Sequence, residues 1–274
     1  MNHQGSNACA GLDEASHQIL EGAASDLINS KSIVIQLTEL AGNAMGAAGS
    51  SASDIIKDKF GIDVTSKAQD IAESALKQVL ETSTTGMDLE NTQEKWGWFH
   101  KLLATASGAG AGFIGAPGLL FDLPVTTGII MRSIAEIARS NPGENLDSED
   151  TKRACIEVFA FGGPENNDDE ADAGYWAVRT GLNHIAIEML IKTVAARFSI
   201  VITEKILAQI VPIAGMFAGG ALNYAFIGYY QQMARVHFAI RKVERGCPDP
   251  SMVRACFSEK VRLARSAGRR ELAK

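Results

Sequence analysis

The sequence predicts an all-α fold, a helical bundle in which two glycine-rich apolar helical hairpins pack in the centre. Apolar residues recur at helical spacing in each well-patterned segment, and no segment alternates apolar and polar residues for long enough to indicate a sheet. Two charge-free runs, residues 102–121 and 206–234, are rich in glycine. With 274 residues, 46% of them hydrophobic, the chain is long enough to bury a core, and we expect one domain overall.

Residues 1–95 are expected to form a helical N-terminal segment. Its clearest helix spans Ser66–Leu80, where apolar residues form a stripe along one face. Glu73 and Lys77 are four residues apart on the opposite face and are expected to form an ion pair. A shorter helix is expected at Ser30–Leu40. The polar residues 1–15 lack the apolar stretch of a secretory signal, so we expect none.

Residues 96–246 are expected to form the helical core. After the first glycine-rich run, a helix over Pro124–Arg139 should stop at Asn141-Pro142-Gly143. Asp147, together with Asp150, should cap the next helix, which ends at Gly162-Gly163. The pattern then predicts one long helix over Tyr175–Phe198.

The glycines of the two charge-free runs recur at spacings that let helix backbones approach closely. We therefore expect the two runs to pack against each other. Insertion of the runs into a bilayer is the alternative, since about 20 apolar residues can cross the hydrocarbon. The glycines on which this packing depends are Gly108, Gly112 and Gly115 in the first run and Gly215 and Gly219 in the second.

Residues 247–274 are expected to form a basic amphipathic helix. From Arg235 onward the chain has 11 basic and 4 acidic residues, a balance of +7, whereas the preceding residues have 15 basic and 28 acidic, a balance of −13. Such a tail favours an anionic partner. Since the tail has no interleaved aromatic residues, we expect no nucleic acid. The expected membrane-surface residues are Trp96, Trp98 and Lys101 before the first run and Arg262, Arg265 and Arg269 in the tail.

Two blocks of the sequence resemble the EcsC family. The first is Lys101–Gly163, which contains GAGAGFIGAPGLLFDLPVTTGIIMRSIAEIA, and the second is Tyr175–Arg241, which contains VPIAG and GGALNY. The resemblance implies an all-helical fold and an association with transport, and it implies no particular reaction.

Asp122 is the first candidate for a polar site, because it lies between two apolar runs. As an N-cap of the Pro124 helix it would need no function. As a buried carboxylate it would require a cation such as Arg132 or Arg235. Asn223 and Tyr224, also surrounded by apolar residues, are expected to form hydrogen bonds to another helix.

No metal and no cofactor are expected from the spacing of the candidate ligands. The five histidines form no HxxxH or HxxE pattern, and the four cysteines form no CxxC pair, so we expect reduced thiols. Gly110–Gly115 matches GxGxxG, but no β-branched run precedes it, as a dinucleotide site would require.

The sequence thus favours a non-enzymatic, membrane-associated protein that is accessory to a transport or envelope process. We expect it to be cytoplasmic and peripheral to the inner face of the plasma membrane. Its expected partner is the anionic membrane surface or a membrane protein related to a transporter. The alternative is a hydrolase of lipid or peptide that uses Asp122 and arginines in a pocket between helices.

Overall fold

The computed structural model describes residues 7–30, 66, 69–74, 76–77, 116–161, 171–210 and 220–272. For residues 7, 116–126, 171–172, 200–210, 220–226 and 268–272 only the backbone is described. All regular elements in these ranges are helices, which confirms the predicted all-α class. Residues 102–115 of the first glycine-rich run and 211–219 of the second lie outside the described residues, so the central packing of two hairpins stays a prediction.

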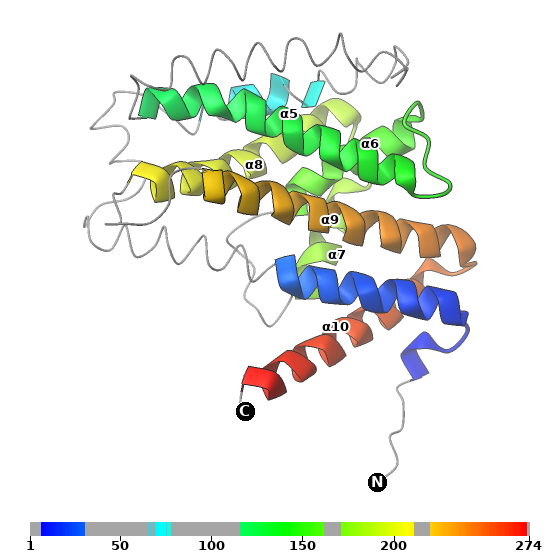
Figure 1. Cartoon of the computed structure of the whole chain (residues 1–274). Coiled ribbons are helices and arrows are strands. Elements are labelled where there is room, and N and C mark those ends of the chain that lie inside the picture. Colours follow the sequence, from blue (N-terminus) through cyan, green and yellow to red (C-terminus); the bar gives the residue numbers. More distant parts are fainter. Residues whose placement is uncertain are drawn as a thin grey trace.

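Helices α5 (Ala116–Ser140) and α9 (Gly220–Gly246) lie side by side and run in the same direction (Figure 1). Midway along the pair, the Gln231 amide donates a hydrogen bond to the hydroxyl of Ser133 at 3.2 Å. Both helices carry buried apolar side chains, because apolar residues recur along each of them at helical spacing. These include Ile130, Ile134 and Ala138 on α5 and Tyr230, Met233 and Ala234 on α9.

The aromatic centre of the core lies where α8 (Ile187–Ile210) packs against α6 (Glu149–Glu157) and its continuation η3 (Val158–Phe161). Phe159 and Phe198 meet edge to face, with ring centroids 4.9 Å apart. The ring centroid of Tyr230 lies 5.2 Å from that of Phe159. Edge-to-face pairs align the positive ring edge with the negative ring face, which adds about 0.5–1.5 kcal/mol to the burial.

The predicted single helix over Tyr175–Phe198 is wrong. The chain forms α7 (Ala171–Leu182), turns at residues 183–186 and continues as α8. Arg153 explains the break, because its guanidinium donates hydrogen bonds to the carbonyl oxygens of Leu182 and Ile185. Helix ends leave such carbonyls without partners, and Arg153, from another element, satisfies them.

Two further helix boundaries differ from the expectation. Helix α5 begins at Ala116, so Asp122 lies inside the helix and is not its N-cap. The N-cap of α6 is Ser148, whose hydroxyl accepts a hydrogen bond from Thr151 N at 3.1 Å, and not Asp147. The predicted stop after α5 is confirmed, since the chain turns at Gly143 with a φ of 89°.

The N-terminal helix (residues 14–30) and α10 (Pro250–Leu272) pack together on the lower part of the bundle in Figure 1. Asp13 caps the N-terminal helix by accepting a hydrogen bond from Ser16 N at 2.8 Å. The amphipathic character of α10 is confirmed, since Val253, Phe257 and Val261 are buried. Of the expected helix Ser66–Leu80, the described residues are helical, and the Glu73–Lys77 ion pair forms at 2.6 Å.

The expectation of four reduced thiols is wrong for two of them. Cys9, in η1 (Asn7–Cys9), forms a disulfide with Cys256 of α10. Their Cα atoms are 4.5 Å apart although the residues are separated by 247 positions in the chain. Because the fold brings the two ends together, spacing along the sequence could not reveal this pair. Cys155 and Cys247 are free.

Candidate functional site

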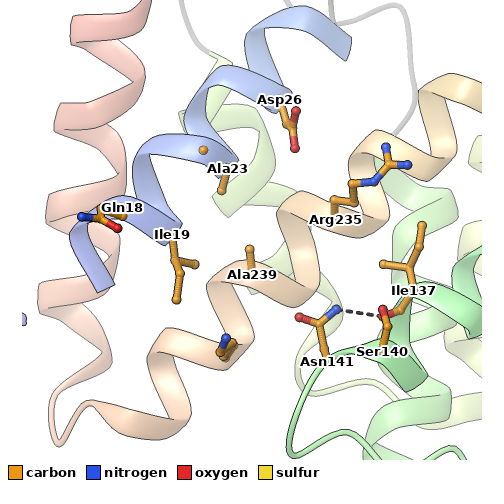
Figure 2. A pocket seen from close by; sticks show the side chains of 11 residues that line it. Gln18, Ile19, Ala23, Asp26, Ile137, Ser140, Asn141, Arg235 and Ala239 are labelled. Atoms are coloured by element: carbon orange, nitrogen blue, oxygen red, sulfur yellow. Dashed lines mark hydrogen bonds between the residues drawn. The ribbon is translucent and has the colours of Figure 1, made fainter. Parts of the chain in front are cut away.

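A pocket of about 430 Å³ opens between the N-terminal helix, the end of α5 and the second half of α9 (Figure 2). Its apolar lining comes from all three helices and includes Ile19, Ile137 and Ala239. The polar lining consists of Gln18, Asp26, Ser140, Asn141, Arg235 and Lys242. The pocket therefore combines an apolar surface with a rim that carries both signs of charge.

The two cations of the rim come from one face of α9. Arg235 and Lys242 are seven residues apart, which is two helical turns, and both are exposed. Neither forms an ion pair with any residue that the structure describes. Two cations on one face of a helix, neither of them in an ion pair within the described residues, form a site suited to an anionic group.

Asp26, on the N-terminal helix, is the one carboxylate in the pocket lining. Figure 2 shows it at the same end of the pocket as Arg235. Partial burial raises the pKa of Asp26, and the positive charge of Arg235 lowers it by a smaller amount. With two cations and one carboxylate, the lining has a net positive charge.

Two polar side chains at the end of α5, Ser140 and Asn141, already form hydrogen bonds within the protein. The Ser140 hydroxyl and the Asn141 side-chain amide both donate hydrogen bonds to the carbonyl oxygen of Ile137, at 2.8 Å each. These bonds satisfy a carbonyl that the end of the helix would leave unpaired. The Ser140 hydroxyl thus donates its proton to a backbone carbonyl and not to a basic side chain, an arrangement that does not activate it as a nucleophile.

The structure separates the residues of the expected polar site. Arg132 forms an exposed ion pair with Glu136 at 3.1 Å on α5. Arg235 lines the pocket, where its nearest acidic neighbour in the lining is Asp26. The side chains of Asp122, Asn223 and Tyr224 lie outside the described residues, although all three positions are helical.

The expected membrane-surface residues are described only in part. Arg262 pairs with Glu259 at 2.6 Å on α10, and its neighbour Lys260 pairs with Glu21 at 2.8 Å. Arg265 is half-buried. The remaining residues of these predictions lie outside the described part of the chain: Trp96, Trp98, Lys101, the Arg269 side chain, Gly108, Gly112, Gly115, Gly215 and Gly219.

A buried ionic cluster joins the ends of α5, α6 and α9. The Glu144 side chain, fully buried, accepts hydrogen bonds from Arg241 at 2.9 Å and 3.2 Å, and also from Arg245 and Thr151. Burial raises the pKa of Glu144, but the hydrogen bonds from these partners together outweigh it, so the pKa lies below its ordinary value. The cluster fixes the loop after α5 onto α9.

A second buried polar group links α6, α7 and α9. The Tyr175 hydroxyl lies 3.0 Å from His237 Nδ1, and His237 Nε2 lies 3.7 Å from a Glu157 carboxylate oxygen. Burial lowers the pKa of His237 well below its usual value and raises the pKa of Glu157. His237 is completely buried. This arrangement has the residue types of a proton relay, but we assign it to the core because its histidine has no exposed surface.

A model of the EcsC protein family matches residues 30–243 of the chain. The chain belongs to the EcsC protein family. No match was found among the curated proteins or among the solved structures. The match confirms the resemblance and extends it into the first hundred residues.

The pocket of this EcsC family member lies across the boundary of the matched range. Its α5 and α9 residues are inside that range, whereas Gln18, Ile19 and Asp26 precede it. Sequence reasoning selected Arg235 but missed Asp26 and Lys242. The seven-residue spacing of Arg235 and Lys242 was visible in the sequence, but only the fold shows that an apolar surface lies beside them.

Proposed function

We propose that this EcsC family protein is a peripheral membrane protein, accessory to a transport or envelope process, that binds anionic lipid headgroups at the pocket between the N-terminal helix, α5 and α9. The observation that supports this most directly is the pair Arg235 and Lys242, exposed on one face of α9 beside an apolar surface. A phosphate group would bind the two cations, while the apolar lining would contact the glycerol and upper acyl region.

The pocket supports this role better than the basic tail does. On α10, Lys260 and Arg262 already pair with carboxylates, and Arg254 lies over the Trp176 ring at 5.5 Å. A cation that already has a partner contributes less to binding, because the partner must be displaced or share its charge. Among the described helices, none combines the length and the apolarity that a membrane crossing requires, which fits binding at the surface.

The test is flotation of the protein with vesicles of phosphatidylcholine, with and without phosphatidylglycerol. We expect binding only to the anionic vesicles, weakening as salt shortens the Debye length to about 10 Å at 0.1 M. Each basic residue near such a surface contributes about 1 kcal/mol, so R235Q/K242Q should weaken binding by roughly 30-fold. The matched control R262Q removes an arginine that already has a partner and should change binding much less.

Two results would count against the proposal. Absence of binding to phosphatidylglycerol vesicles at low salt would exclude a membrane-surface role. Binding that R262Q weakens as much as R235Q/K242Q does would place the contact on α10 instead of at the pocket. The second result would keep the membrane function and reject only its location.

The hydrolase alternative has one observation in its favour. Asp26 is a half-buried carboxyl with a raised pKa, in a pocket with two cations, as a general acid would be. The variant D26N separates the two functions. If the pocket only binds anions, D26N removes a negative charge and should tighten binding to anionic vesicles. A hydrolase would instead lose turnover of phospholipid or peptide substrates in the same variant.

A further inference from the structure

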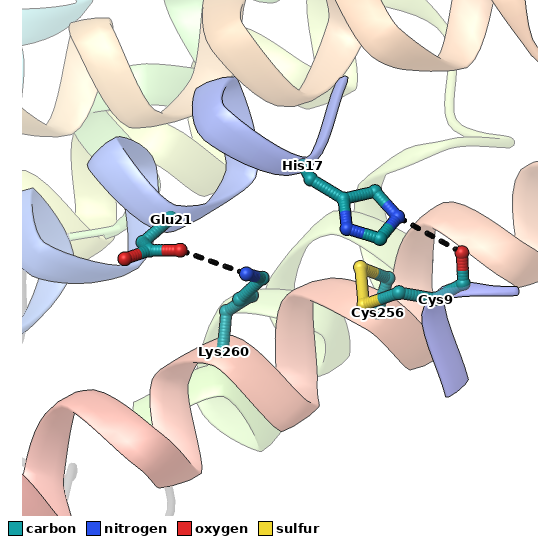
Figure 3. Close-up of a disulfide and its surroundings, with 5 residues drawn as sticks. All are labelled: Cys9, His17, Glu21, Cys256 and Lys260. Atoms are coloured by element: carbon teal, nitrogen blue, oxygen red, sulfur yellow. Dashed lines mark hydrogen bonds and ion pairs between the residues drawn. A yellow bond between two sulfur atoms is a disulfide. The ribbon is translucent and has the colours of Figure 1, made fainter. Parts of the chain in front are cut away.

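The disulfide lies beside a histidine that comes from a third element (Figure 3). Cys9 belongs to η1, His17 to the N-terminal helix and Cys256 to α10. One ligand atom from each residue, the two sulfur atoms and a His17 ring nitrogen, lie within 4.8 Å of one another. Sulfur and imidazole nitrogen are the atoms that zinc prefers.

The hydrogen bond of His17 determines which ring nitrogen is free. Nε2 lies 3.0 Å from the carbonyl oxygen of Cys9, and a carbonyl can only accept, so Nε2 carries the proton. Nδ1 then keeps a lone pair, and Figure 3 shows it on the side of the ring that faces the sulfur atoms. Histidines that bind zinc commonly donate their other N–H to a backbone carbonyl in this way.

We propose that, when the disulfide is reduced, Cys9, His17 and Cys256 bind a zinc ion through two thiolates and Nδ1. Zinc bonds of about 2.3 Å to sulfur and about 2.0–2.1 Å to nitrogen, set at tetrahedral angles, place the ligand atoms of one ion roughly 3.5–3.8 Å apart. The His17 nitrogen already lies within 4.8 Å of both sulfur atoms, and the sulfur atoms, bonded in the oxidised chain, must move apart after reduction to reach this spacing. Three protein ligands leave a fourth tetrahedral position for water.

The conversion balances with a dithiol as the reductant. The dithiol supplies two electrons and two protons, the Cys9–Cys256 bond breaks to give two thiols, and the dithiol becomes a disulfide. Zinc then displaces the two thiol protons and binds both sulfur atoms, so two protons are released for each ion bound. Disulfides are rare where cellular dithiols keep thiols reduced, and there the site would be available to the metal.

The surroundings fit a metal site. Cys256 is fully buried, and the nearby Lys260 is paired with Glu21 at 2.8 Å, so its charge is partly neutralised. Both Cys9 and Cys256 lie outside the residues that match the EcsC family model. The proposed site therefore belongs to the two ends of this chain and not to the family core.

The test uses the full chain, reduced with a phosphine under argon and titrated with Co²⁺ as a probe. We expect one Co²⁺ for each chain, with the visible bands of tetrahedral cobalt and a thiolate-to-cobalt charge-transfer band that Zn²⁺ abolishes. The oxidised protein should show neither band. H17Q removes the nitrogen ligand and keeps a donor for the Cys9 carbonyl. It should weaken binding by about tenfold or more, since even outer-shell changes cost ~10–100-fold.

The variants C256S and C247S complete the test. C256S should abolish the charge-transfer band, whereas the matched control C247S, which removes a free cysteine elsewhere, should leave it unchanged. Far-UV circular dichroism checks that each variant is folded, and H17Q serves if C256S is not. A reduced, folded protein without tetrahedral cobalt bands overturns the proposal, as does binding that is equally strong in the wild type and H17Q.

Discussion

Glu144→Gln should lower the free energy of unfolding by roughly 3–5 kcal/mol, the usual cost of breaking a buried ion pair by removing one partner. The Glu144 side chain is fully buried and accepts hydrogen bonds from Arg241, Arg245 and Thr151. Arg241 keeps an ion pair with Asp150 in the variant, so we expect the lower part of that range. At roughly 2–4 °C for each kcal/mol, the melting temperature should fall by about 6–12 °C.

The matched control is Glu136→Gln, which removes one partner of the exposed pair between Arg132 and Glu136. Because their side chains are 36% and 50% exposed, this change should cost about 0.3–0.5 kcal/mol. Urea unfolding of both variants at neutral pH measures the difference. Equal costs for the two substitutions would refute the view that Glu144 holds the loop after α5 onto α9.

The pH dependence gives a second measurement on the same variant. The folded-state pKa of Glu144 lies below the unfolded value of 4.5, so its contribution is present above pH 4.5 and is lost as the pH falls toward the folded pKa. Wild type should therefore lose more stability than E144Q between pH 5 and the acid limit of the measurement. Parallel acid profiles would contradict the lowered pKa.

Three further predictions follow from single positions. Gly228→Ala should stabilise α9 by about 0.5–1 kcal/mol, because no atom of another residue lies within 4 Å of the added methyl group. Thermal unfolding measures the change. A lower stability of the variant would mean that a neighbouring segment packs closely against this glycine. Gly143→Ala should destabilise by about 1–3 kcal/mol, because its φ is +89° and Arg245 Nε lies 3.0 Å from the new carbon atom. A maleimide should label Cys247 in the native protein but label Cys155 only after unfolding, since burial raises the pKa of Cys155 to about 12; mass spectrometry of the digested protein measures both.

The fold class could be predicted from the sequence because helical periodicity is a local signal. The stop after α5 and the Glu73–Lys77 pair are local in the same sense, and both were found. The break between α7 and α8 was missed because it depends on Arg153, which reaches it from another helix. The start of α5 was missed because Pro124 suggested a first turn, whereas the helix continues through this position.

The candidate site was less predictable, because its residues come from segments that are far apart in the chain. The charge-free residues on both sides of Asp122 made it the first candidate for a polar site. The structure instead places the carboxylate of Asp26 beside Arg235, and these two residues are more than 200 positions apart in the chain. The buried partners Tyr175 and His237 likewise meet only in the folded chain. The spacing of residues along the sequence can reveal ligands that lie on one helix. Here each cluster of polar side chains contains residues from two or more helices, so spacing could not reveal it.

The Cys9–Cys256 bond also determines how the oxidised chain responds to mechanical force. A force applied outside these two residues is carried by the covalent bond, so the chain between them, which spans a sequence separation of 247, is shielded from extension. At about 3.3–3.6 Å of contour length for each residue, reduction would release on the order of 800–900 Å of extensible chain. The helices between Cys9 and Cys256 are thus mechanically isolated from a force applied at the chain ends for as long as the two sulfur atoms stay joined, whereas the part of α10 after Cys256 is not.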